Sequence, residues 1–179
     1  KMLLEEIAEI GMVTESLTGY PDLVTLPCYE WQHMLVFPFD HPLATRERVS
    51  IEDLAAVPLI TYHPSFTGRS RIDHAFAQRH LTPNVVLEAI DSDVIKTYVR
   101  LGMGVGIVAE MAVQGDNQSP DLVTRPGSVL FGHNVARVAF KRGTYLRQFV
   151  LRFAELLSDR LSKELILRAM TGSDDDYDI

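Results

Sequence analysis

The stretch Asp-Ser-Asp-Val-Ile-Lys-Thr-Tyr-Val-Arg-Leu-Gly-Met-Gly-Val-Gly-Ile-Val-Ala, residues 91–109, predicts a helix, a tight turn and a buried strand. Asp91 or Ser92 can cap the helix by accepting hydrogen bonds from its first backbone N–H groups. Apolar residues recur at helical spacing, at positions 94, 95, 98 and 101. Gly102 suits the left-handed residue that ends many helices. The apolar run 105–109 is typical of a strand covered on both faces, so this is one step of an α/β domain.

The glycines of this stretch do not form a dinucleotide-binding loop. Gly102, Gly104 and Gly106 give the pattern G-x-G-x-G. A dinucleotide fingerprint needs its glycines after a strand and at the start of a helix, so that the helix N-terminus faces the pyrophosphate. Here the order is helix, glycines, strand. We therefore expect these glycines to turn the chain and allow close packing, and we predict no cofactor.

Strands and helices alternate on both sides of this stretch. We expect strands at 10–14, 58–62, 85–90, 121–125 and 135–141, and a long β-rich stretch at 23–39 that Pro27 and residues 30–32 interrupt. We expect helices at 2–8, after a capping box of Ser50 and Asp53, from the 63–70 loop to about 80, at 146–157 after Thr144, and at 161–170. Such alternation predicts an α/β fold with a mainly parallel sheet, which binds ligands at the C-terminal ends of its strands.

Composition limits the classes of function. The 179 residues can form one domain or two small lobes, and a net charge of −7 with a pI near 5.3 is a poor match for nucleic acid. Cys28 is the only cysteine, which excludes an internal disulfide, and we expect a buried, inert thiol. No apolar run approaches the roughly 20 residues that span a bilayer. The first ten residues are acidic where a signal peptide is apolar, so we expect the chain to begin inside a larger protein.

One loop has the features of an anion site. Thr67-Gly68-Arg69-Ser70 opens a predicted helix, whose N–H groups and dipole favour an anion. Thr67 supplies a hydroxyl donor, Gly68 lets a ligand approach the backbone, and Arg69 adds positive charge. The alternative is a plain helix cap in which Ser70 and Asp73 form the capping box.

Other reactive side chains give weaker signals. Trp31 is the only tryptophan and can either line a ligand pocket or fill an interface between lobes. The six histidines lack the spacing of a metal site, so we predict no metal. No G-x-S-x-G motif occurs, and no nucleophile, base and orienting group come together in the sequence. We therefore expect that the protein is not an enzyme.

Several segments closely resemble the effector-binding domain of LysR-type transcriptional regulators, in the CysB-like branch that activates cysteine biosynthesis and sulfur assimilation. They are residues 10–17, 26–31, 40–43, 58–62, 66–70 and 91–106. The Asp-His-Pro-Leu segment at 40–43 is common across the wider family, whereas Phe-Thr-Gly-Arg-Ser at 66–70 and the 91–99 segment are far more specific. The resemblance covers roughly residues 5–157 in order and without a large gap.

The resemblance implies two Rossmann-like lobes joined by crossover strands, as in type 2 periplasmic binding proteins. Residues 1–35 and 131–179 would form lobe I with the C-terminal helices, and residues 36–130 lobe II. The effector would be a small anion such as sulfate, or N-acetylserine or O-acetylserine, bound between the lobes. Thr14 and Thr67 would be ligand hydroxyls, with Trp31 beside the cleft.

The resemblance also implies partners and a location. Such regulators are cytoplasmic homodimers or tetramers that bind promoter DNA through a helix-turn-helix domain, which is absent from this chain together with lobe I's first strand. The His63-Pro64-Ser65 segment also departs from the family's more usual Thr-Phe-Gly type. The alternative from another class is a periplasmic-type solute-binding protein for a small anion, which shares the fold but has a signal peptide.

Overall fold

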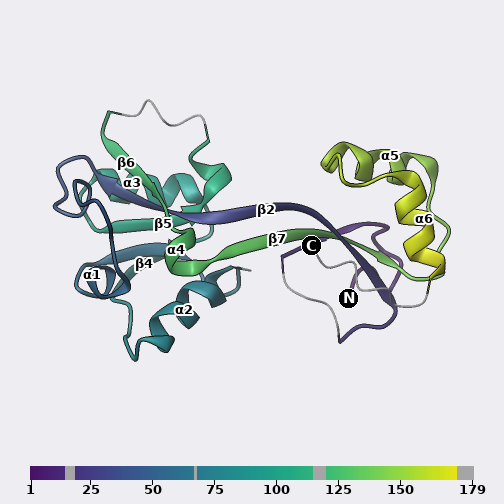
Figure 1. The fold of residues 1–179 in the computed structure, drawn as a ribbon, viewed down its shortest axis with the longest axis horizontal. Helices are drawn as coiled ribbons and strands as arrows, with labels where there is room; N and C mark the ends of the chain where they lie inside the picture. Colours follow the sequence, from purple (N-terminus) through teal and green to yellow (C-terminus); the bar gives the residue numbers. More distant parts are fainter. Residues whose placement is uncertain (15–18, 67, 115–119, 173–179) are drawn as a thin grey trace. The chain divides into compact units, whose positions relative to one another are not determined.

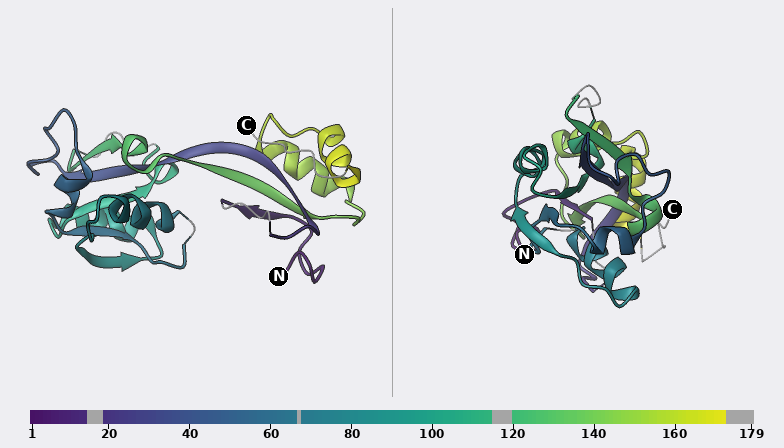
Figure 2. Two further views of the ribbon diagram at one scale, coloured as in Figure 1. Left: turned by 60° about the horizontal axis from the view of Figure 1, so that its bottom comes forward. Right: turned by 90° about the vertical axis from the view of Figure 1, so that its left-hand side faces the viewer.

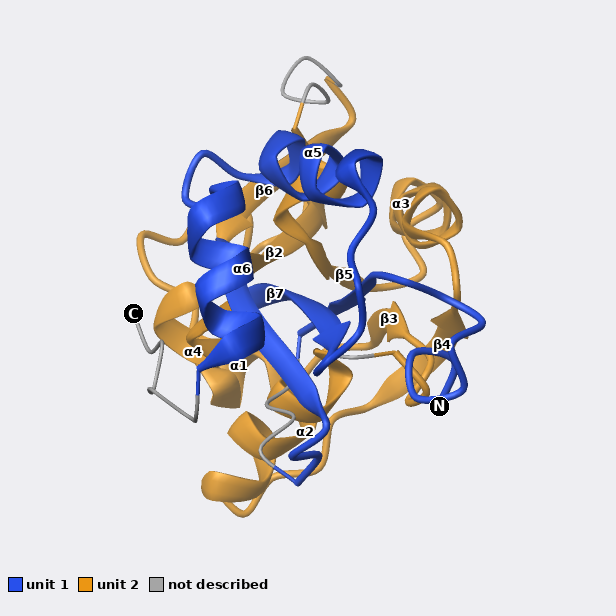
Figure 3. Ribbon diagram, turned by 90° about the vertical axis from the view of Figure 1, so that its right-hand side faces the viewer, with its two compact units in different colours: residues 1–30, 135–179 blue, residues 31–134 orange. Residues whose placement is uncertain are grey.

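The computed structural model describes residues 1–14, 19–66, 68–114 and 120–172, and divides the chain into two compact units. Unit 1 contains residues 1–30 and 135–179, and unit 2 contains residues 31–134 (Figure 3). Strands β2 (Leu23–Pro38) and β7 (His133–Lys141) pass from one unit into the other. The chain thus passes between the units at 30/31 and 134/135, and the lobe boundaries that the resemblance implies, 35/36 and 130/131, stay a prediction.

Strand β2 is continuous, although the sequence predicted interruptions at Pro27 and at residues 30–32. Its buried positions are even-numbered up to Cys28 and odd-numbered from Trp31 to Leu35, after which all residues up to Pro38 are buried because helices cover both faces of the sheet. Tyr29 and Glu30, both exposed, lie between the two patterns. The polar break therefore marks a change of buried face within one strand, because the strand contributes first to the core of unit 1 and then to that of unit 2.

The sheet of unit 2 is mixed (Figure 1). Strand β3 (Leu59–Tyr62) lies between β4 (Val85–Ala89) and β5 (Val105–Ala109) and is parallel to both. Strands β5 and β6 (Leu122–Pro126) each pair antiparallel with β2. The predicted mainly parallel sheet is thus correct only for β4, β3 and β5. These are the strands joined by full crossover helices, as parallel pairing requires.

Helices cover both faces of this sheet (Figure 2). Helices α1 (Ile51–Ala55), α2 (Arg69–Gln78) and α4 (Ser128–Phe131) pack in a core with odd-numbered residues of β2. Helix α3 (Ser92–Arg100) packs on the other side, where the short helix η1 (Glu110–Ala112) also lies. The two cores share their central strands and include Leu35, Phe37, Leu59, Ile72, Phe76 and Ile107 on one side and Val36, Ile60, Ile95, Val99 and Val108 on the other.

Helix α3 and the turn after it follow the prediction in part. Asp91 caps the helix, since its Oδ1 accepts from the Asp93 backbone N at 2.6 Å, and Gly102 has a φ of 75°. The buried face is centred on Ile95 and Val99, however, while positions 94 and 101 are exposed. A Cβ added to Gly106 would lie only 2.9 Å from Val99 Cγ2, so close contact with β5 fixes which face is buried.

Unit 1 contains β1 (Gly11–Val13), which pairs antiparallel with β7, and the helices α5 (Gln148–Leu157) and α6 (Lys163–Thr171). The helices pack with β2 and β7 in a core that includes Leu26, Cys28, Val138, Phe140, Val150, Ala154 and Ile166. Residues 2–6 are turns rather than the predicted helix. Helix α5 starts after Arg147, not Thr144, because Arg147 is still extended and the Thr144 backbone N closes the preceding turn on the Lys141 carbonyl.

None of the helices within the described ranges combines the length and the apolar character needed to cross a bilayer.

Candidate functional site

The start of helix α2 requires a glycine. Gly68, the N-cap residue, has a φ of 93°, which L side chains rarely adopt, and has no side chain of its own to cap the helix. A Cβ at Gly68 would lie 3.0 Å from Trp31 Cη2 and 3.3 Å from His33 Nε2. Conformation and space therefore both require glycine here, and the backbone of the helix start lies directly against two ring side chains of β2. The alternative of a Ser70–Asp73 capping box is wrong, because the cap residue is Gly68.

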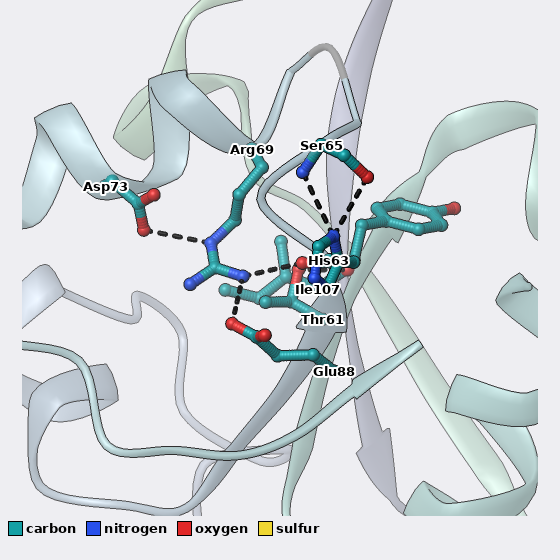
Figure 4. Close-up of polar contacts among 8 residues, drawn as sticks. Thr61, His63, Ser65, Arg69, Asp73, Glu88 and Ile107 are labelled. Carbon is teal, nitrogen blue, oxygen red and sulfur yellow. Dashed lines mark hydrogen bonds and ion pairs between the residues drawn. The ribbon is translucent and has the colours of Figure 1, made fainter. Parts of the chain in front are cut away.

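The loop before Gly68 is held by its own hydrogen bonds (Figure 4). The Ser65 backbone N donates to His63 Nδ1 at 3.2 Å, and the Ser65 hydroxyl lies 2.9 Å from the same nitrogen. The His63 backbone N donates to the Ala89 carbonyl at 3.1 Å. Because an amide N–H can only donate, His63 Nδ1 accepts in the hydrogen bond from Ser65 N.

Arg69 is engaged in hydrogen bonds inside unit 2 (Figure 4). Its Nε donates to Asp73 at 2.9 Å, and its Nη1 donates to Glu88 at 2.8 Å and to the Tyr62 carbonyl at 2.6 Å. Burial acts to lower the pKa of Arg69, but the bonds to Glu88 and Asp73 outweigh it and raise the pKa above its ordinary value. The guanidinium thus anchors the first turn of α2 to β3 and β4, and the predicted contact of Arg69 with an anion stays a prediction.

Trp31, His33 and Phe131 form a cluster of ring side chains beside Gly68. The centroid of the His33 ring lies 5.1 Å from that of Trp31 and 5.7 Å from that of Phe131, both with edge-on geometry. All three side chains are buried, and His33 is only 1% exposed. This cluster closes one side of the α2 start, so Trp31 packs against the predicted anion loop.

His33 is neutral at physiological pH. Burial, with a smaller contribution from the positive charge of Arg71, lowers the pKa of His33 from 6.5 to about 4. Its Nδ1 is buried and has no hydrogen-bond partner among the described residues. A buried polar atom without a partner is uncommon and calls for an explanation.

Thr14 and Thr67 are the two predicted ligand hydroxyls. Thr14 follows β1 in unit 1, and its Oγ1 is buried without a partner among the described residues. Thr67 lies outside the described residues. The structure thus brings Gly68 and Trp31 into contact in unit 2 and gives Arg69 an anchoring role.

His33 was missed by the sequence-based reasoning. The alternation of buried residues at 31, 33, 35 and 37 was the available signal, since it places His33 on the same face of β2 as Trp31. Cys28 agrees with its prediction, because it is buried and burial raises the pKa of its thiol. In the ranges that the structure describes, no three His, Cys, Asp or Glu side chains lie together as metal ligands would.

Comparison with known proteins identifies the family. The LysR substrate binding domain matches residues 1–162. This chain belongs to that family. It is 48% identical over 179 residues to the HTH-type transcriptional regulator CysB of Burkholderia cenocepacia, covering 100% of this chain and 57% of that protein. It is 44% identical over 172 residues to the HTH-type transcriptional regulator cbl of Escherichia coli, covering 96% of this chain and 54% of that protein.

The fold agrees with this assignment. The crystal structure of the cofactor-binding domain of the Cbl transcriptional regulator matches with a TM-score of 0.85 and 44% identity, over 96% of this chain and 75% of that one. The effector-binding domain of QuiR in complex with shikimate matches with a TM-score of 0.74 at 16% identity, which shows the fold alone. The predicted α/β fold class is confirmed, and the relatives are transcriptional regulators rather than enzymes. The chain spans about half the length of these curated regulators.

Proposed function

We propose that this chain is the effector-binding domain of a LysR-type regulator of sulfur assimilation and cysteine biosynthesis. In this proposal it senses a small anion, either sulfate or N-acetylserine or O-acetylserine. Its likeness to CysB, SsuR and cbl regulators at 44–48% identity supports the regulatory class. The observation that carries the anion is the start of α2, where a left-handed glycine takes the place of a side-chain cap.

The chemistry of the α2 start suits an anion. The helix has ten residues, and its dipole places partial positive charge at Gly68. Arg69 supplies no uncompensated charge, since Asp73 and Glu88 neutralise it. Recognition would therefore depend mainly on uncharged donors, namely backbone N–H groups and the Thr67 hydroxyl. The proposed contacts are Thr67, Gly68, Arg69 and Trp31 in unit 2 and Thr14 in unit 1, with Arg69 using guanidinium donors other than Nε and Nη1.

The partners belong to the proposal as well. The relatives are named HTH-type regulators, and promoter DNA would be bound through such a domain outside these 179 residues. A homodimer or tetramer in the cytoplasm is the expected setting. The chain's net charge of −7 agrees with a domain that does not itself hold DNA.

Thr67→Val is the test, because valine keeps the shape of threonine and removes the donor. A charge-assisted hydrogen bond contributes roughly 1.5–3 kcal/mol, so we expect affinity for sulfate or O-acetylserine to fall about ten- to hundredfold in calorimetric titration. The matched control is Thr97→Val, since the Thr97 hydroxyl donates to the Asp93 carbonyl within α3. We expect this control to leave affinity unchanged.

A plain capping role for Thr67 gives a different result. The loss would then be about 1 kcal/mol of unfolding free energy with ligand affinity unchanged. Melting curves recorded beside the titrations separate the two outcomes. Unchanged affinity in Thr67→Val would remove Thr67 from the site.

A further inference from the structure

The ring cluster beside Gly68 lies where the chain enters and leaves unit 2. Strand β2 enters this unit at Trp31, and β7 leaves it after Asn134. Helix α4 and its cap residue Gly132 directly precede β7. The cluster therefore takes Trp31 and His33 from β2 and Phe131 from α4, and Phe131 lies two residues before β7.

His33 contacts the start of α2, its neighbour Trp31 on β2, and both ends of α4, each with a different atom or face. Its Nε2 lies against Gly68, and the edges of its ring meet Trp31 and Phe131. Its carbonyl accepts from the Gly127 backbone N at 2.8 Å. A Cβ at Gly127 would lie only 2.7 Å from that carbonyl oxygen. The cap glycines of α2 and α4 are thus both packed directly on His33.

Arg71 provides a second contact between α2 and the end of α4. The residue lies in the first turn of α2, and a Cβ at Gly132 would be 3.5 Å from its Nη1. Gly132 has a φ of 71° and is the last residue before β7. The start of α2 therefore touches the segment 127–132 through His33 and also through Arg71.

We propose that His33 is a positioning residue that ties occupancy of the α2 start to the two strands by which the chain enters and leaves unit 2. This inference rests on the proposed function, because it requires an effector at Gly68. Protein interiors are close-packed, and the His33 ring lies against both Gly68 and Trp31, so a shift of either on binding displaces it. Through Phe131 and the Gly127 amide, that displacement reaches the segment that continues into β7. The buried Nδ1 of this ring has no hydrogen-bond partner among the described residues, and a polar atom kept in that state agrees with a functional reason for its place.

Hydrogen exchange measured by mass spectrometry tests this coupling on the 179-residue chain, with and without saturating sulfate or O-acetylserine. In the wild type we expect the ligand to slow exchange at residues 68–71 and also at 127–134. In His33→Gln we expect the slowing at 68–71 to persist and that at 127–134 to fall at least threefold. A purely structural role of His33 would speed exchange with and without ligand alike. The matched control is His41→Gln, because His41 also packs against a phenylalanine, Phe37, in the same unit.

A second variant, His33→Phe, keeps a ring between Trp31 and Phe131 and guards against loss of folding in the glutamine variant. Because the coupling acts through the packed ring, we expect His33→Phe to keep most of the ligand-induced slowing at 127–134 that His33→Gln loses. A His33→Phe protein that binds the ligand without this slowing would overturn coupling through the ring.

The outcomes distinguish the two proposals. Full ligand-induced slowing at 127–134 in His33→Gln, or none there in a wild type that binds ligand, overturns the coupling while the proposed function stands. A wild type that binds neither sulfate nor an acetylserine in calorimetry overturns the proposed effector, and the coupling with it.

Discussion

Helices α2 and α3 follow neighbouring parallel strands of unit 2, and they begin in different ways. Helix α3 is capped by its own carboxylate, Asp91, at 2.6 Å. Helix α2 begins at a left-handed glycine without a side-chain cap and is anchored instead by the ion pairs of Arg69. A carboxylate cap completes a helix start and excludes anions, whereas a glycine cap leaves the same position accessible to them. The contrast distinguishes a structural helix start from one that can take a ligand.

Giving α2 a cap like that of α3 has the largest expected effect. In Gly68→Asp the new carboxylate repels an anion at close range, so we expect sulfate affinity to fall on the order of hundredfold or more. Gly68→Ala is the control, because it adds the Cβ without the charge and so costs about 1–3 kcal/mol of backbone strain. Titration calorimetry on both variants measures the difference. Equal losses of affinity would mean that packing against Trp31, rather than charge, decides binding.

Acidification tests the cluster against which α2 rests. The folded state lowers the pKa of His33 from 6.5 to about 4, so the unfolded chain binds a proton more readily in this range. Keeping His33 neutral therefore favours the folded state: its contribution to the free energy of unfolding is fully present above pH 6.5 and is lost as the pH falls toward 4. It amounts to about 3 kcal/mol in total, of which about 2 kcal/mol is lost between pH 7 and pH 5.

Urea unfolding at pH 7 and pH 5 measures this dependence. We expect His33→Gln to remove most of the difference in unfolding free energy between the two pH values, whereas His41→Gln should remove only a small part, since burial lowers the pKa of His41 as well. Wild-type and His33→Gln proteins with the same pH dependence would show that His33 does not titrate in this way.

Removing the cap of α3 should have a smaller and purely structural effect. Asp91→Ala deletes the bond to the Asp93 backbone N, which should lower the free energy of unfolding by about 1 kcal/mol. Because α3 takes no ligand in this interpretation, affinity for sulfate and O-acetylserine should not change. A fall in affinity without a fall in melting temperature would show that α3, too, belongs to the effector site.

The smallest effect is expected at α1, whose capping box of Ser50 and Asp53 has an exposed ion pair added to it. Arg46 contacts Asp53 at 2.6 Å, and more than half of the Arg46 side chain is exposed. Surface pairs of this kind contribute about 0.5 kcal/mol or less and are screened by salt. Arg46→Ala should therefore lower the melting temperature slightly at low salt and not measurably in about 0.5 M sodium chloride.

The local features of these helix starts could be predicted from sequence, and their surroundings could not. Asp91, Gly102 and the Ser50–Asp53 box act on backbone groups a few residues away, so the sequence contains the whole interaction. Arg69 and Gly68 lie at the start of α2, but Glu88 reaches Arg69 from strand β4 and His33 reaches Gly68 from strand β2. Sequence suggested the charge of Arg69 but not the carboxylates that neutralise it. For the same reason it predicted the crossover helices but not the antiparallel pairing of β2 with β5 and β6.

The change of buried face in β2 limits which insertions and deletions the chain can tolerate. Tyr29 and Glu30 separate even-numbered buried positions from odd-numbered ones. Successive side chains of a strand point to opposite faces of the sheet. Loss of one residue between Cys28 and Trp31 would therefore turn the buried side chains on one side of Tyr29 and Glu30 toward solvent and the exposed ones toward the core. Trp31 and His33 would then turn outward together. Loss or gain of two residues would preserve both inward sets, so homologous chains should vary in length at this junction by even numbers.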